Sequence, residues 1–396
     1  MERMVRMKFV LHPKSEIDAR IEKLRRQMGD MTGAILFGSV DMCYFSGTAQ
    51  EGLVYIPRDS DTQPVVMIRK SLERARQESP LDVSLLKTFR TLKADLGIPS
   101  GAEIGLELDV LPYNSYSRVE RALGDAKLVD VSKTIEIIRS VKSEFEINLI
   151  KEAARILDAG IASVSEHLTV GMREMELAGK VEAEMRALGH PGTIFFRRFN
   201  HVLPMGHFMS GPNAAVPSFV ASPTGGRGVS LLQPQGPGFR KIRRNEPVLV
   251  DYGGAYNGYI ADETRIFSIG KLSNELEDAH IAALDIQEAV ARELGFGKTG
   301  RDLFDLSEAV GIGYKDHLGG PPDGKCGFVG HGVGLEIDEY PVLGPVDHPI
   351  LSNMTIAVEP KMIYPGVGVV GIEDTFHTTA DGAQRLTKLP QEIWRV

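Results

Sequence analysis

The sequence has few cysteines and no long apolar run. Among its 396 residues the cysteines are Cys43 and Cys326, which is too few for a disulfide framework. No apolar stretch approaches the roughly 18–20 residues of a membrane-spanning helix, and the apolar run at residues 9–11 is too short for the core of a signal peptide. The hydrophobic content of 42% and charged content of 25% are ordinary for a globular protein. We therefore expect a soluble cytoplasmic protein with no membrane partner.

An excess of positive charge is also lacking. The chain has 45 lysines and arginines against 53 aspartates and glutamates, a formal net charge of −8. Nucleic-acid-binding domains usually carry clustered positive charge, so this balance argues against a nucleic-acid partner. The sequence also lacks the His-Glu-x-x-His and Gly-x-Ser-x-Gly patterns of two common hydrolase classes. Neither of these motifs explains the chain.

The pattern of apolar residues indicates two domains. Up to about residue 130, short apolar strands at 33–37, 52–56 and 64–68 alternate with helical stretches near 70–78 and 114–123. Ser15 and Asp18 resemble a capping box that opens an earlier helix, through about Met28. A long amphipathic helix over 144–168 then begins a second region. We therefore expect an α/β (α+β) protein with domains at 1–138 and 139–396.

The second region combines strands, helices and one long loop. The loop spans residues 221–239 and is rich in glycine and proline, and loops of this length in compact domains are often functional. Further elements are expected as two strands over 246–270, two helices over 273–310, and strands near 354–362 and 367–378.

The most informative stretch, DYGGAYNGYIADETRIF, contains Asp251 and Asp262. They are eleven residues apart, an odd number, so on one straight strand their carboxylates would point to opposite faces. The glycines between them, together with Asn257, instead mark a hairpin turn. A hairpin brings the two carboxylates back toward each other. Because adjacent carboxylates repel, the simplest remedy is a metal cation.

Further candidate ligands follow. His331 lies between two glycines, which would let the backbone pass close to a site. Glu359 lies in Val-Glu-Pro and Glu373 in Ile-Glu-Asp-Thr, on predicted partner strands of a hairpin. One histidine and four carboxylates suit Mn²⁺, Co²⁺, Zn²⁺ or Fe²⁺ rather than copper or an iron–sulfur cluster. Four carboxylates carry too much negative charge for one divalent ion, so we expect two divalent metal ions, with Mn²⁺ as the first choice.

The order and spacing of these motifs are similar to those of the M24 metallopeptidase superfamily, which includes aminopeptidase P, prolidase, methionine aminopeptidase and creatinase. The motifs cover about 250–375, and the helices before them extend the match back to about 140. The resemblance implies a creatinase-type α/β domain at 1–138 and a pita-bread catalytic domain at 139–396. It also implies a metallohydrolase similar to Xaa-Pro aminopeptidase or prolidase, with a short-peptide or small-molecule substrate, and a homodimer.

Carried over to this sequence, the resemblance assigns a ligand set to each ion. Asp251, Asp262 and Glu373 would hold the first, and Asp262, His331, Glu359 and Glu373 the second, so that Asp262 and Glu373 bridge. Such a pair lowers the pKa of a water molecule and turns it into a nucleophile at neutral pH. Glu359 would assist the proton transfer. The implied reaction is hydrolysis of a peptide or small amide bond.

Two histidines that surround the substrate in the family's peptidases are absent. Ser218 and Asp338 stand where they are expected. In the family these imidazoles bind the substrate and help to stabilise the tetrahedral intermediate, and losing one such donor costs about 10²–10³ in rate. Ser218 can still donate a hydrogen bond, whereas an ionised Asp338 cannot. His201 and His207 are candidates to point into the pocket instead. The candidate catalytic residues are Glu359, His331, Ser218, Asp338 and His207.

These replacements leave two alternatives open. One is a non-peptidase member of the superfamily that acts on a C–N bond of a small molecule or works as a lyase. Creatinase works without metal, which the retention of all the ligands disfavours here, and the lyases carry an extra aspartate where Gly253 stands. The other alternative is a catalytically inactive metal-binding homologue.

Overall fold

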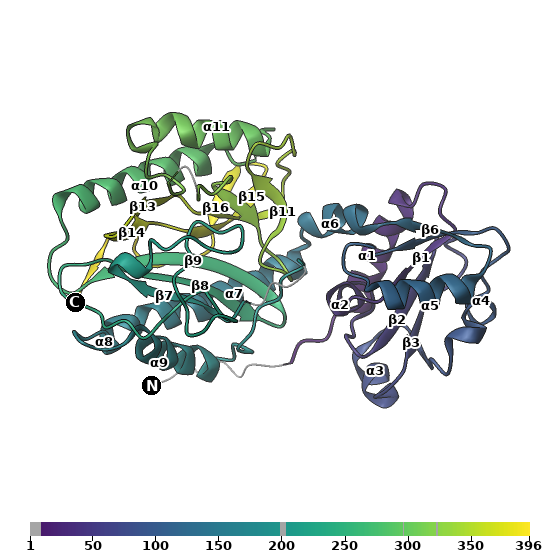
Figure 1. Ribbon diagram of the computed structural model, residues 1–396. Coiled ribbons are helices and arrows are strands. Elements are labelled where there is room, and N and C mark those ends of the chain that lie inside the picture. Colours follow the sequence, from purple (N-terminus) through teal and green to yellow (C-terminus); the bar gives the residue numbers. More distant parts are fainter. Residues whose placement is uncertain (1–8, 199–202, 296, 322–323) are drawn as a thin grey trace. The chain divides into compact units, whose positions relative to one another are not determined.

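The computed structural model describes residues 9–198, 203–295, 297–321 and 324–396 (Figure 1). The chain divides into two compact units, Met1–Arg139 and Ser140–Val396. Each unit combines helices with β-sheet, and the α/β fold class predicted from the sequence is confirmed. Within the described ranges, no helix has the length and apolar character needed to cross a membrane.

The first unit is built on one mixed sheet of six strands in the order β4-β3-β2-β1-β5-β6. β2 is antiparallel to β1 and β3, and the other neighbours are parallel. The strands are β1 (Gly33–Leu36), β2 (Gly52–Pro57), β3 (Val65–Ile68), β4 (Asp82–Leu85), β5 (Glu103–Leu106) and β6 (Lys127–Asp130). The helices are α1 (Lys14–Gln27), α2 (Ser39–Ser46), α3 (Leu72–Glu78), η1 (Phe89–Thr91), α4 (Leu92–Asp95), α5 (Tyr113–Leu123) and α6 (Ser132–Ser140).

The capping box predicted for α1 is wrong. The helix begins at Lys14, and Pro13 takes the N-cap position without a side-chain hydrogen bond. Proline suits the start of a helix because its φ is already fixed and it has no amide hydrogen to satisfy. Asp18 instead accepts a hydrogen bond of 2.8 Å from Lys14 Nζ, one turn earlier.

The described residues of the second unit form three β-sheets. Their strand orders are β17-β9-β8-β7, β11-β10-β12-β15-β16 and β13-β14. The first sheet contains β7 (Gly206–Ser210), β8 (Val248–Tyr256), β9 (Tyr259–Ser268) and β17 (Trp394–Arg395). The others contain β10 (Gly330–Gly332), β11 (Glu339–Leu343), β12 (Thr355–Val358), β13 (Lys361–Tyr364), β14 (Gly368–Gly371), β15 (Asp374–Thr379) and β16 (Gly382–Arg385).

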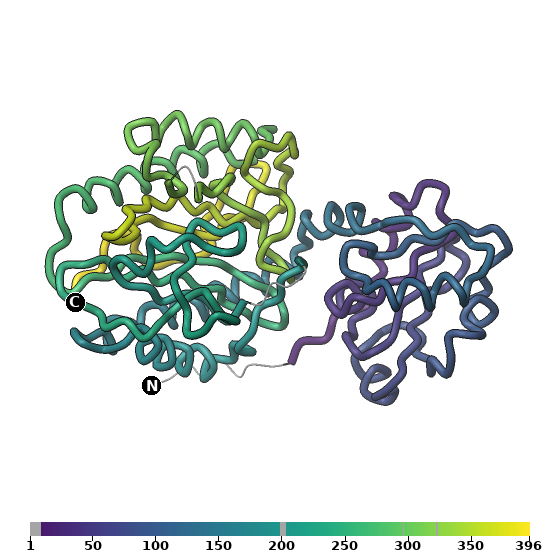
Figure 2. The backbone as a smooth tube through the Cα atoms, in the orientation of Figure 1, coloured from purple at the N-terminus to yellow at the C-terminus, as the bar shows by residue number. Residues whose placement is uncertain are grey.

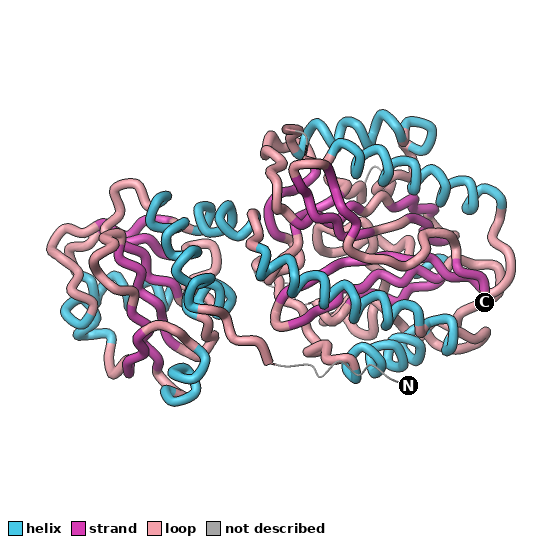
Figure 3. The backbone as a smooth tube through the Cα atoms, turned by 180° about the vertical axis from the view of Figure 1, so that it is seen from behind, coloured by secondary structure: helices cyan, strands magenta, loops and turns pink. Residues whose placement is uncertain are grey.

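Helices cover the outer faces of these sheets. They are α7 (Glu144–Ala162), α8 (Val164–His167), α9 (Glu174–Ala187), η2 (Gly211–Asn213), α10 (Asn274–Glu293), α11 (Gly300–Val310) and η3 (Ile312–Tyr314). The helix predicted over 144–168 is thus divided into α7 and α8. α7 lies along β8 and β9, α9 lies beside β7, and α10 packs on β13, β14 and β16 (Figures 1 and 3). The strands lie between these two groups of helices.

The close approach of α7 to β8 explains one glycine of the central motif. A Cβ atom on Gly254 would lie 2.4 Å from the carbonyl oxygen of Ala153 in α7. Ser143 and Glu146 form the capping box that opens this helix. The local sequence therefore both starts the helix and lets it pack directly on the strand that carries Asp251.

Two parts of the chain that are distant in sequence meet in the middle of this unit. Thr264 in β9 pairs with Glu373, which precedes β15. In the backbone trace, the teal-green strands β8 and β9 lie beside the yellow strands near the C-terminus (Figure 2). This junction brings the motif around residue 262 to the motifs around 359 and 373.

Candidate metal centre

The hairpin predicted from the spacing of Asp251 and Asp262 is confirmed. β8 and β9 are joined by Asn257 and Gly258, with φ of +49° and +88°, as in the tight turns favoured between antiparallel strands. Asp262 pairs with Gly253, two residues after Asp251 in β8. Residues two apart on a strand share a face, and so do directly paired residues. The two carboxylates therefore lie on the same face of the hairpin as diagonal neighbours.

Glu359 and Glu373 lie at breaks between strands, so the prediction of continuous strands through 354–362 and 367–378 is wrong. β12 ends at Val358 and β13 begins at Lys361, while β14 ends at Gly371 and β15 begins at Asp374. Pro360 contributes to the first break because it has no amide hydrogen for the ladder. These breaks place both carboxylates at the junction with β9.

His331 occupies the middle of the short strand β10, between β11 and β12. A Cβ atom on Gly330 would lie 2.4 Å from the carbonyl oxygen of Ala357, and one on Gly332 would lie 2.2 Å from that of Tyr340. The flanking glycines therefore allow the neighbouring strands to pack closely. The sequence had predicted that these glycines let the backbone pass close to a ligand, but their observed role is close packing against the neighbouring strands.

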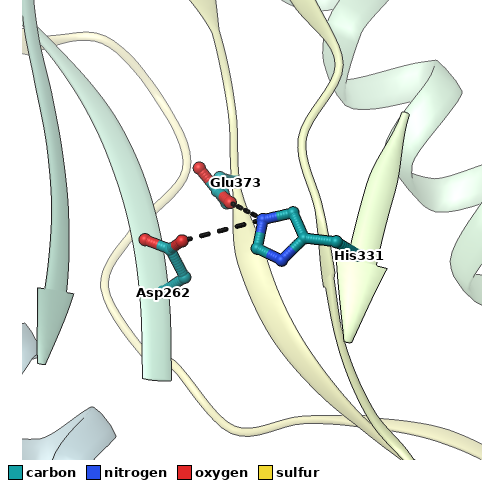
Figure 4. A group of neighbouring side chains, drawn as sticks. All are labelled: Asp262, His331 and Glu373. Atoms are coloured by element: carbon teal, nitrogen blue, oxygen red, sulfur yellow. Dashed lines mark ion pairs between the residues drawn. The ribbon is translucent and has the colours of Figure 1, made fainter. Parts of the chain in front are cut away.

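Asp262, His331 and Glu373 converge on one point (Figure 4). One potential ligand atom from each lies within 4.8 Å of the other two. His331 Nε2 is 3.8 Å from Asp262 Oδ2, 3.8 Å from Glu373 Oε1 and 3.4 Å from Glu359 Oε1. Glu373 Oε1 is buried and has no hydrogen-bond partner among the described residues. Imidazole and carboxylate donors around an orphaned oxygen fit a divalent metal ion.

The electrostatics of the cluster also favour the binding of a cation. Burial raises the pKa of Asp262 to about 8, and the neighbouring Asp251 contributes to the rise. Burial likewise raises the pKa of Glu373 well above its ordinary value, with Asp262 and Glu359 as further causes. Both shifts combine two physical causes, burial away from water and repulsion between neighbouring carboxylates. A bound cation would relieve this repulsion.

Lys361 is a member of the cluster that the sequence analysis missed. Its Nζ atom lies 2.9 Å from Glu359 Oε2, 2.9 Å from Glu373 Oε2 and 3.5 Å from Asp251 Oδ2, and its side chain is fully buried. Burial by itself would lower the pKa of Lys361, but the three carboxylates raise it well above the ordinary value. Burial would raise the pKa of Glu359, yet Lys361 and His331 lower it to about 2. A lysine two residues after Glu359, at the start of an apolar strand, was the available signal.

The predicted substrate-shell residues have different surroundings. Asp338 lines the pocket above the cluster and its Oδ1 lies 3.4 Å from His331 Nδ1. Burial lowers the pKa of His207, which lines the same pocket and pairs with Asp251 across β7 and β8. Ser218 is not among the described residues that line the pocket, and its hydroxyl donates to Gln235 Oε1 at 3.1 Å. His201 lies outside the described residues.

The pocket itself has a polar floor and an apolar wall. Its volume is about 60 Å³, and the carboxylates and His331 form its floor. The long loop contributes Gln235, whose side-chain nitrogen lies 3.1 Å from His207 Nε2, a contact that the sequence analysis missed. The apolar part of the lining consists of Ile194, Phe196, Leu203, Val220, Ala221, Phe328 and Ile337. A ligand with a small apolar group beside a polar reacting group would match this division.

Comparison with known proteins finds relatives over almost the whole chain. Residues 148–380 match the metallopeptidase family M24, and residues 20–141 match the creatinase/prolidase N-terminal domain. The Xaa-Pro dipeptidase of Pyrococcus furiosus is 30% identical over 94% of this chain and 99% of its own length. The structure of the Xaa-Pro dipeptidase from Bacillus anthracis superposes with a TM-score of 0.81, with 27% identity over 96% of this chain and 100% of the other. The structure of the prolidase from Pyrococcus horikoshii superposes with a TM-score of 0.80, with 25% identity over 95% of this chain and 99% of the other.

Proposed function

Because this chain belongs to metallopeptidase family M24 and is a metallohydrolase of that type, we propose that it hydrolyses Xaa-Pro dipeptides. The predicted superfamily is confirmed, together with its creatinase-type N-terminal domain and its pita-bread fold. The observation that carries the proposal is the cluster of Asp262, His331 and Glu373 beneath a pocket with an apolar wall. The substrate class is supported by relatives named Xaa-Pro dipeptidase.

The residues of the site have different roles in the proposed reaction. Asp262, His331 and Glu373 would hold a divalent ion, which supplies a water nucleophile at neutral pH and polarises the substrate carbonyl. Glu359 presents Oε1 on the side of His331, and we assign the proton transfer to this oxygen. The apolar wall receives the proline ring of the substrate and keeps bulk water from it.

Asp338 acts through His331 rather than as a replacement for the absent histidine. A carboxylate near the second ring nitrogen of a ligand histidine fixes the orientation of the ring and strengthens it as a ligand. Asp338 is in this position, 3.4 Å from His331 Nδ1. His207, the cross-strand neighbour of Asp251, and Gln235 provide further polar groups in the lining of the pocket.

Finer assignments belong to the same proposal. We propose Mn²⁺ as the native ion, with Co²⁺, Zn²⁺ or Fe²⁺ as substitutes, because a site rich in carboxylates suits these ions. We also keep the domain limits at 1–138 and 139–396, a homodimer and a cytoplasmic location as predictions. The limits lie one residue from the division between the two compact units, Met1–Arg139 and Ser140–Val396.

A second candidate is hydrolysis of a small non-peptide C–N bond. The replacements at 218 and 338 favour it, because Ser218 binds Gln235 and Asp338 faces His331, so neither supplies the imidazole that family peptidases use. This second reaction would use the same divalent ion and the same water nucleophile. It would differ from dipeptide hydrolysis only in the substrate group that the pocket accepts.

The test of the proposed function compares two dipeptides of similar size. Metal-depleted protein is reconstituted with Mn²⁺, Co²⁺, Zn²⁺ or Fe²⁺ and assayed with Ala-Pro and Ala-Ala. We expect Ala-Pro to be cleaved in preference to Ala-Ala, and a chelator to abolish cleavage. Protein that binds metal but cleaves neither dipeptide would contradict the proposal and favour the second candidate.

Replacing Asp338 by asparagine should weaken metal binding by about 10–100-fold, the usual effect of losing an outer carboxylate partner of a ligand histidine. The measurement is a metal titration by calorimetry, with unfolding curves to show that the variant is folded. Ser218→Ala is the matched control, because Ser218 stands at the other position where the family has a histidine, yet it contacts Gln235 rather than the cluster. Equal metal affinities of the Asp338→Asn and Ser218→Ala variants would show that Asp338 does not act through His331.

A further inference from the structure

Lys361 places a positive charge inside the metal cluster. Its Nζ atom contacts one oxygen each of Asp251, Glu359 and Glu373, at 3.5, 2.9 and 2.9 Å. The side chain of Lys361 has no exposed surface. The ammonium donates hydrogen bonds to Glu359 Oε2 and Glu373 Oε2, and it forms a longer ion pair with Asp251 Oδ2. Lys361 therefore binds the carboxylates in the way that a metal ion would.

The contacts of Lys361 include Asp251, the carboxylate expected to hold only the first ion. The family resemblance assigns Asp251 to the first ion alone, Glu373 to both ions and Glu359 to the second alone. Lys361 contacts all three, and its contact with Glu359 is through Oε2. On the other side of the cluster, Asp262 and His331 face Glu373 Oε1. This oxygen has no hydrogen-bond partner among the described residues. Lysine thus occupies the Asp251 side of the cluster, and the His331 side keeps its ligand atoms available.

The two oxygens of Glu373 are divided between these two sides. Oε2 accepts hydrogen bonds of 2.9 Å from Lys361 Nζ and 2.9 Å from Thr264 Oγ1. Oε1 faces His331 Nε2 at 3.8 Å. An oxygen that already accepts from an ammonium and a hydroxyl has little capacity left for a metal ion. Glu373 can then coordinate one ion through Oε1 but cannot bridge two.

The fold also makes room for this lysine. Lys361 in β13 pairs with Gly371 in β14. A Cβ atom on Gly371 would lie 2.9 Å from Lys361 Cα and 3.2 Å from Lys361 Cδ. A larger residue at 371 would therefore displace the lysine side chain. A Cβ atom there would also lie 2.5 Å from the carbonyl oxygen of Pro360, so Gly371 allows close packing on both the backbone and the aliphatic part of Lys361.

From these contacts we propose that Lys361 replaces the first metal ion, so that the site binds a single divalent ion at Asp262, His331 and Glu373. This inference rests on the proposed metal-dependent function and changes its metal content from the two ions expected from the sequence to one. Asp251 becomes a partner of Lys361 and of Thr224, whose hydroxyl lies 3.3 Å from its Oδ2. A second ion on that side would have to displace the ammonium, since like charges repel at such short range.

The test measures metal stoichiometry rather than activity. Purified wild-type protein is saturated with Mn²⁺ and with Zn²⁺, freed of excess metal, and analysed by native mass spectrometry and elemental analysis. We expect one equivalent per chain for the wild type. Lys361→Met removes the charge while keeping much of the length, and we expect this variant to bind two equivalents.

Lys142→Met is the matched control. Lys142 is also a buried lysine paired with a carboxylate, Glu339, at 3.0 Å, but it lies outside the metal cluster. Its replacement should leave the stoichiometry at one. Two equivalents in the wild type, none in the wild type, or one in both the wild type and Lys361→Met would each overturn the inference. Dipeptide cleavage by a two-ion wild type would leave the proposed function intact, whereas a one-ion protein without peptidase activity would refute the function alone.

A measurement on the wild type alone keeps the inference testable if Lys361→Met does not fold. Electron paramagnetic resonance of the protein saturated with Mn²⁺ distinguishes an isolated ion from a coupled pair. We expect the six-line spectrum of isolated Mn²⁺. The many-line spectrum of two exchange-coupled ions would overturn the inference.

Discussion

Replacing Asp262 by asparagine is expected to lower kcat/KM for Ala-Pro by at least about a thousandfold. The side chain keeps its shape but loses the negative charge that faces His331 and the free oxygen of Glu373. Metal catalysis stabilises the transition state by several kcal/mol, and a loss of about 4 kcal/mol corresponds to about a thousandfold in rate. The metal content of the variant should fall together with the activity.

The control for this variant is another aspartate-to-asparagine change. Asp278 lies on the exposed side of α10, and Asp278→Asn should alter kcat/KM by less than about twofold, as expected for a surface position without a specific contact. Both variants are assayed after saturation with Mn²⁺, and their metal content is measured in parallel. An Asp262→Asn variant that retains its metal and loses less than about tenfold in activity would contradict the assignment of this residue as a ligand.

Replacing Arg265 by methionine is expected to destabilise the protein by about 3–5 kcal/mol, the usual cost of removing one partner from a buried ion pair. Arg265 is fully buried and pairs with Asp374 at 2.7 Å. It also donates to the backbone carbonyl oxygens of Glu373, at 2.8 Å, and of Pro390, at 2.9 Å. Without the guanidinium, a buried carboxylate and these carbonyl groups would all lose a donor.

The measurement is urea unfolding of the metal-free protein, so that changes in metal affinity do not enter. Arg292→Met is the control, because Arg292 pairs with Glu288 at 2.6 Å while both side chains are largely exposed, at 70% and 71%. Such surface pairs contribute about 0–1 kcal/mol. A similar loss of unfolding free energy in Arg265→Met and Arg292→Met would contradict the stabilising role of the buried Arg265 pair. Because Arg265 holds the backbone of Glu373, we also expect weaker metal binding by Arg265→Met.

The metal cluster could be anticipated from the sequence because its signals are local. Asp251 and Asp262 are separated by residues whose turn preference is strong, and Asn257 and Gly258 form that turn with positive φ. The convergence with His331 and Glu373 could not be derived from local pattern, since it depends on the pairing of Thr264 with Glu373 across more than a hundred residues. Only the resemblance of the ordered motifs supplied it.

Lys361 shows where sequence reasoning failed. A lysine at the start of a strand is ordinarily exposed, and its closeness in sequence to Glu359 does not by itself indicate that three carboxylates surround its ammonium. The breaks in the strands at Glu359 and Glu373 were missed for a similar reason, because each break is only two residues long and residues of strand type lie within a few positions on both sides. Asp338 was identified as a departure from the family pattern, but its position beside His331 Nδ1 appeared only in the folded chain.

The central claim is that this chain holds a single divalent ion in a cluster completed by its own lysine. The most direct test is anomalous X-ray scattering at the manganese absorption edge, from crystals of wild-type protein grown with excess Mn²⁺. The account predicts one anomalous peak, between Asp262, His331 and Glu373, and electron density for Lys361 Nζ between Glu359 and Glu373. Two peaks with Lys361 displaced from the carboxylates, or no peak at this site, would contradict it.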